Sequence, residues 1–272
     1  MGMRDFQAKV KALEEINSND TTTTASAVQK HSNDYKLLQV ALETDVNKIH
    51  ALPTLDQKIE QKRRYFLPKW LPYVEQYFEQ GETYQNDILG YCIVYLFDVG
   101  ELGRAIELAQ KAEAQGQRLP EKFKSTLANF VADTVLKWTE QQHRQQQPQE
   151  PYFSQVFRLI FSRWTVHDIV KSKWLKMGGC LLIADKNGQP NAAKIDDAER
   201  LNIARLLFLK AFTLNEKIGV KNLINRCEMR LNVLVLTPSQ NGNDTADNTL
   251  NRENVIERAL TILTQAQGGR HV

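Results

Sequence analysis

The stretch that decides the fold is Lys62–Pro120, which reads KRRYFLPKWLPYVEQYFEQGETYQNDILGYCIVYLFDVGELGRAIELAQKAEAQGQRLP. Its basic start leads into a Pro-Lys-Trp-Leu-Pro turn at 68–72, and an apolar helix is expected at 87–97. An Asp-Val-Gly-Glu turn at 98–101 joins that helix to an alanine-rich one at 102–115, where small side chains allow close helix–helix packing. This order is typical of a tetratricopeptide-type helical hairpin.

Apolar residues recur at helical spacing through most of the remaining chain, and no stretch alternates for long enough to predict a strand. Proline at Pro53 and Pro68 is expected to end the helix before it, because proline lacks the amide donor and clashes with the preceding turn. The sequence therefore predicts an all-α protein. The further expected helices span 6–16, 35–52, 55–65, 71–80, 120–140, 152–164, 168–184, 199–214, 220–234 and 251–265.

Polar, low-complexity stretches divide the chain into four parts. An N-terminal helix and a flexible linker occupy 1–33, and that helix is either a docking element or a frayed terminus. A helical-bundle core is expected at 34–140 and tetratricopeptide-like hairpins at 152–236, with a linker and a final helix at 237–272. The stretch QQHRQQQPQEP between the two middle parts is either a domain boundary or a loop.

Composition narrows the class of protein. With 272 residues, 25% charged and 42% hydrophobic, and a net charge of +3, the chain is globular and only weakly basic. Any nucleic-acid contact must then come from local clusters of cations. The three dispersed cysteines (Cys92, Cys180 and Cys227) predict neither disulfides nor zinc, and favour a reducing cytosol. The absence of a signal peptide and of a long apolar span predicts a soluble, intracellular protein that does not associate with a membrane.

The best nucleic-acid candidate is the stretch 58–70. Arginine donates paired hydrogen bonds to phosphate, and Tyr65 and Trp70 could pack on sugar or base. The alternative is a solvated helix end whose cations favour the C-terminal dipole. The candidate DNA-binding residues are Lys58, Lys62, Arg63, Arg64 and Lys69.

A second basic set follows in the later half of the chain. Its cations alternate with Phe157, Phe161, Trp164 and Trp174, so helical spacing would send the aromatic rings inward and the cations outward. A solvated face is the usual meaning of such a charge run. The set consists of Arg158, Arg163, Lys171, Lys173 and Lys176.

The acidic residues and histidines of the sequence do not form a recognisable catalytic motif. A metal-dependent nuclease needs converging carboxylates, but Asp87 and Asp98 stand about 16 Å apart along one helix. We interpret Asp87 as a helix N-terminal acceptor, and Asp98 and Glu101 as turn residues. The five histidines are dispersed, and no phosphate-binding Gly-rich loop with Lys-Ser/Thr occurs. No cofactor is expected, except Mg²⁺ if the chain itself is a nuclease.

Several of these motifs together resemble a known family, the small terminase subunits of temperate contractile-tailed phages, also called terminase endonuclease subunits. The resemblance spans 35–140 and, more weakly, 168–234. It implies a homo-oligomer in the host cytoplasm that binds the packaging (cos) site of concatemeric phage DNA. It also implies a large-subunit partner that holds the ATPase and nuclease. The motifs are Leu67–Pro72, Asn86–Leu89, Asp98–Glu101, Ala105–Glu107, Lys173–Gly179 and Gly219–Lys221.

The family name credits an endonuclease, whereas these residues show no such chemistry. We therefore expect a non-catalytic subunit that licenses cleavage by the complex. Where such proteins can end in a basic tail, this chain has the helix 251–265, which we expect to dock on the large subunit. Two alternatives stay open: a metal-dependent DNA endonuclease, and a tetratricopeptide-like scaffold without DNA contact.

Overall fold

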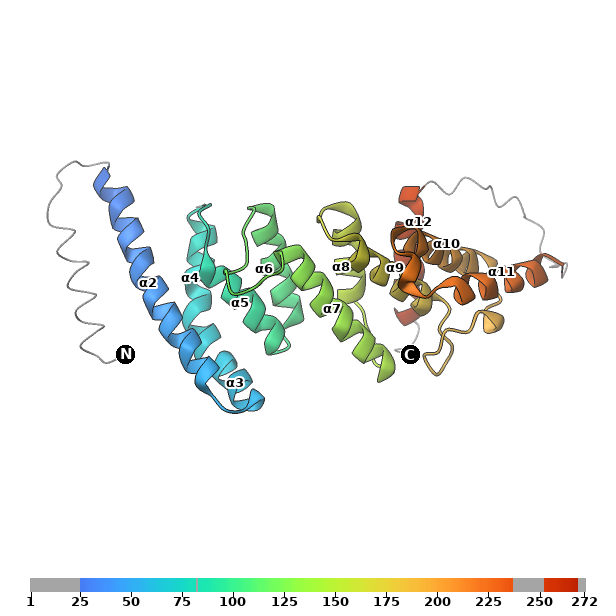
Figure 1. Cartoon of the computed structure of the whole chain (residues 1–272), viewed down its shortest axis with the longest axis horizontal. Helices are drawn as coiled ribbons and strands as arrows, with labels where there is room; N and C mark the ends of the chain where they lie inside the picture. Colours follow the sequence, from blue (N-terminus) through green and yellow to red (C-terminus); the bar gives the residue numbers. More distant parts are fainter. Residues whose placement is uncertain (1–24, 82, 237–251, 269–272) are drawn as a thin grey trace. The chain divides into compact units, whose positions relative to one another are not determined.

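The structure is a computed structural model that describes residues 25–81, 83–236 and 252–268 (Figure 1). These ranges are helical apart from turns and one isolated β-bridge between Ala184 and Pro190, so the all-α prediction is confirmed. Packing divides the chain into two compact units, Met1–Glu101 and Leu102–Val272. The predicted helix at 6–16 and linker at 237–248 lie outside the described residues.

The described part of the first unit begins with a long helix and ends with a buried one. Helix α2 already starts at Ala25, so the predicted linker is wrong over 25–33, where Ala, Val, Gln and Lys tolerate a helix. Thr54 and Asn86 cap the next two helix starts, accepting hydrogen bonds from the amides of Gln57 and Leu89. The elements are α2 (Ala25–Ala51), α3 (Leu55–Gln61), η1 (Lys62–Phe66), α4 (Leu67–Glu79) and α5 (Asp87–Asp98).

The predicted turn at 68–72 is wrong, because α3, η1 and α4 form one continuous helix. Its middle segment η1 is a π turn, in which the Leu67 amide donates to the Lys62 carbonyl five residues earlier. In an α-helix the ring of Pro68 would clash with the carbonyl of Arg64. The wider π turn before Pro68 accommodates the ring, and the helix continues to Glu79.

Glycine ends the last helix of the first unit. Gly100 has a φ of 85°, and its amide donates to the Phe97 carbonyl while that of Glu101 donates to Leu96. These two bonds form a Schellman motif, which needs a left-handed residue at this position. The turn at 98–101 is therefore confirmed, and it leaves the side chain of Asp98 facing back toward the helix that carries the basic residues.

The second unit packs its helices around Trp174. The indole stacks on Phe153 with ring centroids 5.1 Å apart, and it donates to the Ala132 carbonyl at 3.2 Å. A Cβ on Gly179 would lie 2.5 Å from the ring of Phe208, so only glycine permits the observed approach of α9 and α10. The elements are α6 (Leu102–Ala114), α7 (Leu127–Arg144), α8 (Tyr152–Ser162), α9 (Asp168–Leu182), η2 (Ala192–Lys194), α10 (Ala198–Leu214), η3 (Glu216–Ile218), α11 (Lys221–Leu236) and α12 (Arg252–Gly268).

Two predicted boundaries in this unit change. Helix α7 begins at Leu127 instead of residue 120, because Thr126 caps it by accepting from the amide of Asn129. Residues 145–151, in the polar stretch after α7, form a loop between α7 and α8, which pack against each other within the unit. The first compact unit ends at Glu101, within the range 34–140, and the division of the chain into four parts stays a prediction.

The hairpin predicted near the end of the chain is present. Helices α10 and α11 pack together and are joined by η3 and Gly219, whose φ is 74°. The other predicted hairpin consists of α5 and α6, which belong to different units. The tetratricopeptide-like detail stays a prediction. In the described part of the chain, no helix combines the length and apolarity needed to cross a bilayer.

Candidate nucleic-acid interface

The first set of predicted cations lies on the continuous helix of α3, η1 and α4, which we call the basic helix. Within its π turn, Lys62 and Phe66 are buried, whereas Arg63, Arg64 and Tyr65 are exposed. Within this turn Lys62 therefore points into the fold, while both arginines face solvent.

Lys62 points inward and links the basic helix to the end of α5. Only 9% of the residue is exposed, and its Nζ lies 2.6 Å from Oδ2 of Asp98 and 4.4 Å from the ring centroid of Tyr95. Burial, with the neighbouring Tyr91 and Asp98, raises the pKa of the Tyr95 hydroxyl well above its usual value. Asp98 is therefore a partner of Lys62, a role that the sequence reading as a turn residue missed.

The two arginines point outward with weaker internal partners. Arg63 donates from Nη2 to the Val99 carbonyl at 2.9 Å, close to the C-terminus of α5 where a cation is favourable. Arg64 forms a surface ion pair with Glu60 one turn earlier on the same helix. Lys58 lies half-buried on α3, and its ammonium group makes no ion pair with any described residue. These cations are available for exchange with an anion.

The carboxylate of Asp45 on α2 interacts with three neighbouring side chains, two of them on the basic helix. Its Oδ2 lies 2.6 Å from Nζ of Lys69 and accepts from Nε1 of Trp70 at 3.2 Å, and Lys48 lies 3.3 Å from Oδ1. Burial raises the pKa of Asp45, but the hydrogen bonds and charges of Lys69 and Lys48 outweigh it, and the net pKa lies below the usual value. Asp45 is therefore ionised at neutral pH and holds Lys69 against α2.

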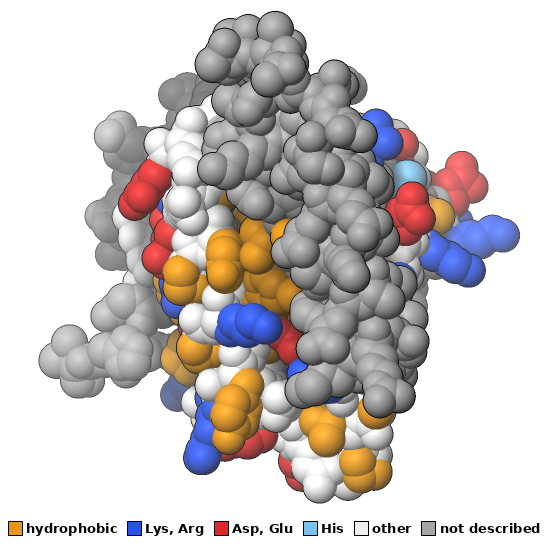
Figure 2. Space-filling model, turned by 90° about the vertical axis from the view of Figure 1, so that its left-hand side faces the viewer, with side chains coloured by type: hydrophobic (Ala, Val, Ile, Leu, Met, Phe, Trp, Pro, Cys, Tyr) orange, Lys and Arg blue, Asp and Glu red, His pale blue; other side chains and the backbone are white. Residues whose placement is uncertain are grey.

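Two tyrosines, and not Trp70, are the aromatic groups that reach solvent here. Trp70 is fully buried, so the expectation that it could pack on a base is wrong. The uninterrupted helix places it on the inner face beside Phe66 and Leu67. Tyr65 and Tyr73 are 62% and 39% exposed on the outer side. Figure 2 views the molecule from the side of the first unit, where hydrophobic and cationic side chains lie next to each other.

The second set of cations lies on α8 and α9 of the second unit. Phe157, Trp164 and Trp174 are buried, as their spacing predicts. Arg158 pairs with both carboxylate oxygens of Glu257 at 3.1 Å, and this hydrogen bonding raises its pKa. Lys176 donates to the Ile218 carbonyl at 2.9 Å, Lys171 is half-buried, and Arg163 and Lys173 are exposed.

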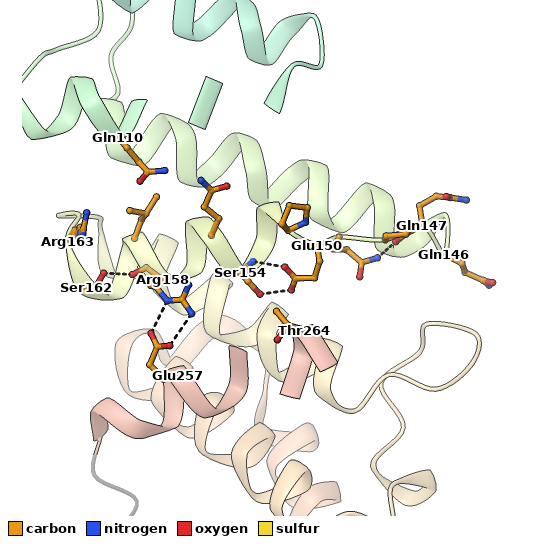
Figure 3. A pocket seen from close by; sticks show the side chains of 15 residues that line it. Gln110, Gln146, Gln147, Glu150, Ser154, Arg158, Ser162, Arg163, Glu257 and Thr264 are labelled. Atoms are coloured by element: carbon orange, nitrogen blue, oxygen red, sulfur yellow. Dashed lines mark hydrogen bonds and ion pairs between the residues drawn. The ribbon is translucent and has the colours of Figure 1, made fainter. Parts of the chain in front are cut away.

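A groove of about 1050 Å³ runs along α8 and includes Arg158 and Arg163 (Figure 3). Glu150 in its wall accepts from the amide and hydroxyl of Ser154 at 3.2 and 2.5 Å, and Glu257 faces it from α12. Two arginines and two glutamates balance in charge, and most other lining side chains are amides or hydroxyls. This groove was missed in the sequence, because its walls come from α6, α8, α12 and the 145–151 loop. The remaining lining residues are Gln110, Gln146, Gln147, Pro148, Gln149, Pro151, Ser154, Gln155, Leu159, Ser162 and Thr264.

The C-terminal helix α12 is a structural part of the second unit. Its apolar side chains, among them Ala259, Leu260 and Leu263, are buried, and the helix packs on α8, α9 and α10. The expectation that this helix docks on another subunit is therefore wrong for its apolar face, which the chain itself covers. The sequence predicted the helix and its apolar stripe, but periodicity does not tell which surface covers a stripe.

The carboxylates considered for catalysis are separate in the structure. Asn86 is the N-cap of α5 and accepts from the amide of Leu89, and Asp87 follows it in the first turn of that helix. Asp98 pairs with Lys62, and exposed Glu101 follows the Gly100 turn. Among the residues that the structure describes, no three His, Cys, Asp or Glu side chains come together as metal ligands.

Comparison with known proteins gives a consistent match. The profile of a family described as phage small terminase subunit matches residues 39–169. The chain is 50% identical over 235 residues to a protein of Haemophilus phage HP1 (strain HP1c1) named "Probable terminase, endonuclease subunit", covering 86% of this chain and 84% of that protein. It is also 25% identical over 211 residues to the "Terminase, endonuclease subunit" of Escherichia phage P2, covering 78% and 80% respectively. No solved structure matches the chain.

Proposed function

Because the chain belongs to the family of phage small terminase subunits, we propose that it is the DNA-recognition and assembly subunit of a terminase. It binds the packaging (cos) site of concatemeric phage DNA in the host cytoplasm and forms a homo-oligomer. It then delivers the duplex to a large subunit with ATPase and nuclease activity. The observation that carries this proposal is the row of outward cations Arg63, Arg64 and Lys69 on the basic helix.

Phosphate can compete with the internal partners of these cations. The pair between Arg64 and Glu60 is solvent-exposed on both sides, and such pairs contribute only about 0–1 kcal/mol. Replacing the glutamate by a DNA phosphate therefore costs little, and the counterions released from DNA favour the exchange. Lys62 is excluded from this role, because it is buried and its charge is paired with Asp98, whereas the side chain of Lys69, although paired with Asp45, is 49% exposed.

The test is fluorescence anisotropy with a cognate cos duplex at several salt concentrations. Changing Arg63, Arg64 and Lys69 together to Ala should weaken binding strongly at low salt. It should also reduce the slope of log affinity against log salt by roughly 2–3, since each phosphate contact contributes about 0.9. Light scattering on the wild-type protein measures the expected assembly in the same buffer.

A matched control removes the same charge from the second unit by changing exposed Lys122, Lys124 and Lys186 to Ala. This variant should keep the wild-type salt slope. Equal losses in both triple variants would show that net charge, and not the basic helix, governs DNA binding. Unchanged binding in the first variant would refute the proposed interface.

Exposed apolar side chains near the end of α11 support assembly into an oligomer. Met229, Val233 and Val235 are 67%, 48% and 82% exposed on this helix. Grouped apolar surface of this kind is typical of protein–protein contacts. The second copy of this chain, or the large subunit, would cover it.

In this proposal, DNA is cut by the terminase complex and not by this chain alone. The names of the relatives contain the word endonuclease, whereas Asp98 of this chain pairs with Lys62, Asp87 lies in the first turn of α5 and Glu101 follows a turn. Incubating the protein alone with plasmid and Mg²⁺ or Mn²⁺ separates the two functions. Metal-dependent cutting that disappears in Asp87→Ala or Asp98→Ala would establish the endonuclease alternative instead.

One observation favours the scaffold alternative. The groove along α8 is charge-balanced and rich in amides, which suits an uncharged or mixed peptide better than a polyanion. Binding of a partner peptide together with complete absence of DNA binding would support a scaffold without DNA contact.

A further inference from the structure

The outer surface of the basic helix alternates aromatic rings and cations. Tyr65 and Tyr73 lie eight residues apart, about 12 Å along the axis, with Arg64 beside the first and Lys69 between them. Most other aromatic side chains of this unit, including Phe66, Trp70 and Tyr77, are buried. With Tyr84, which lies outside the basic helix, these two rings are the exposed exceptions among the described aromatic side chains of this unit.

Neighbouring groups support the ring of Tyr73 and the ammonium group of Lys69. Tyr73 packs on the buried indole of Trp70 with centroids 5.5 Å apart, and Nζ of Lys69 lies 4.8 Å from the centroid of the same indole. Asp45 in turn anchors both Trp70 and Lys69. An anchored ring loses little conformational freedom when a ligand stacks on it.

Exposed rings between cations suit one form of nucleic acid better than another. In an intact duplex the base faces are stacked on each other and cannot pack on a protein ring. Unpaired bases offer their faces, and stacking on aromatic side chains contributes to binding of single strands without regard to sequence. Arg64 and Lys69 would meanwhile contact the phosphates between the stacked bases.

We propose that the basic helix binds an unpaired stretch of DNA, with bases stacked on Tyr65 and Tyr73 and phosphates on Arg64 and Lys69. This inference rests on the proposed DNA-binding function and names the form of DNA that this surface takes. A second copy of the chain covering the two rings is the competing explanation, and the experiment separates the two.

The test compares the full chain with single-stranded oligo-dT and with a duplex of equal length, about 20 nucleotides, by fluorescence anisotropy. Changing Tyr65 and Tyr73 together to Ala should raise the Kd for oligo-dT at least about tenfold and that for the duplex less than about twofold. The matched control changes both to Phe, which keeps the rings and should keep the affinity for oligo-dT.

Each result has a defined meaning. Wild-type protein that binds the duplex but not oligo-dT, or Ala variants that bind oligo-dT normally, would overturn this inference and leave the proposed function standing. Protein that binds neither DNA would refute the proposed function itself. A loss of oligomer mass in the Ala variant would assign the rings to a contact between copies and overturn the inference.

A second measurement applies if the Ala variant loses its helical circular dichroism. Wild-type protein is photo-crosslinked to iodouracil-substituted oligo-dT, and the modified peptides are identified by mass spectrometry. Crosslinks on Tyr65 or Tyr73 support the stacking. Crosslinks confined to other residues exclude it.

Discussion

The basic helix of the first unit and the cation-bearing surface of α8 and α9 look alike in the sequence but differ in their surroundings. On the basic helix, Arg63 and Arg64 face solvent beside two exposed tyrosines, and among the described residues their ion pair is with Glu60 of the same helix. On α8, Arg158 meets Glu257 from a helix 99 residues later in the chain. We therefore expect anion binding at the basic helix, where the fold leaves Arg63 and Arg64 without a carboxylate from another described helix, and not at Arg158.

The largest expected effect comes from breaking the inward pair of the basic helix. Lys62→Ala should lower the free energy of unfolding by about 2–3 kcal/mol. Removing one partner of a buried pair costs about 3–5 kcal/mol, and this loss is smaller because the Asp98 side chain is 40% exposed. Urea unfolding followed by circular dichroism measures it.

Arg64→Ala on the same helix is the matched control for Lys62. It removes a cation from a surface pair and should cost less than about 1 kcal/mol. The effects on DNA affinity should have the opposite order. Arg64→Ala should bind DNA more weakly than the wild type, and folded Lys62→Ala should bind it with an affinity close to that of the wild type. Equal stabilities of the two variants would contradict the division into inward and outward cations.

A smaller effect concerns pH at Asp45, which links α2 to the basic helix. Its folded pKa lies below the usual 3.8, so its pair with Lys69 contributes stability above that pH. The contribution is lost as the pH falls through the folded pKa. The melting temperature of the wild type should therefore drop more steeply than that of Asp45→Asn over this acidic range. Parallel curves would show that Asp45 does not contribute to stability in this way.

The smallest effect is expected in the second unit, at the pair between Arg158 and Glu257. Both side chains are more than half exposed, at 54% and 56%, so their coupling energy should lie at about 0–1 kcal/mol despite the two-pronged geometry. A double-mutant cycle with Arg158→Ala and Glu257→Ala measures it, and added salt should reduce it. A coupling well above this range would mean that the pair, and not the buried apolar face of α12, holds this helix in place.

Several features were predictable because they depend on local sequence. The α10–α11 hairpin followed from apolar periodicity and Gly219, and the inward direction of Phe157 and Trp174 followed from spacing. The break expected at Pro68 was wrong, because the cost of a proline depends on the geometry of the preceding turn. Because the helix is continuous, Trp70 lies in the core, and Tyr73 is the residue whose ring is exposed.

By itself, the sequence determined that this protein is helical and that it resembles the phage small terminase subunits, since helical periodicity and short motifs are local properties. Only the tertiary structure decided which cations pair with distant parts of the chain. The partners of Lys62, Lys69 and Arg158 lie 36, 24 and 99 residues away in the chain. Contacts at such separations are set by how whole helices pack, and no local pattern encodes them.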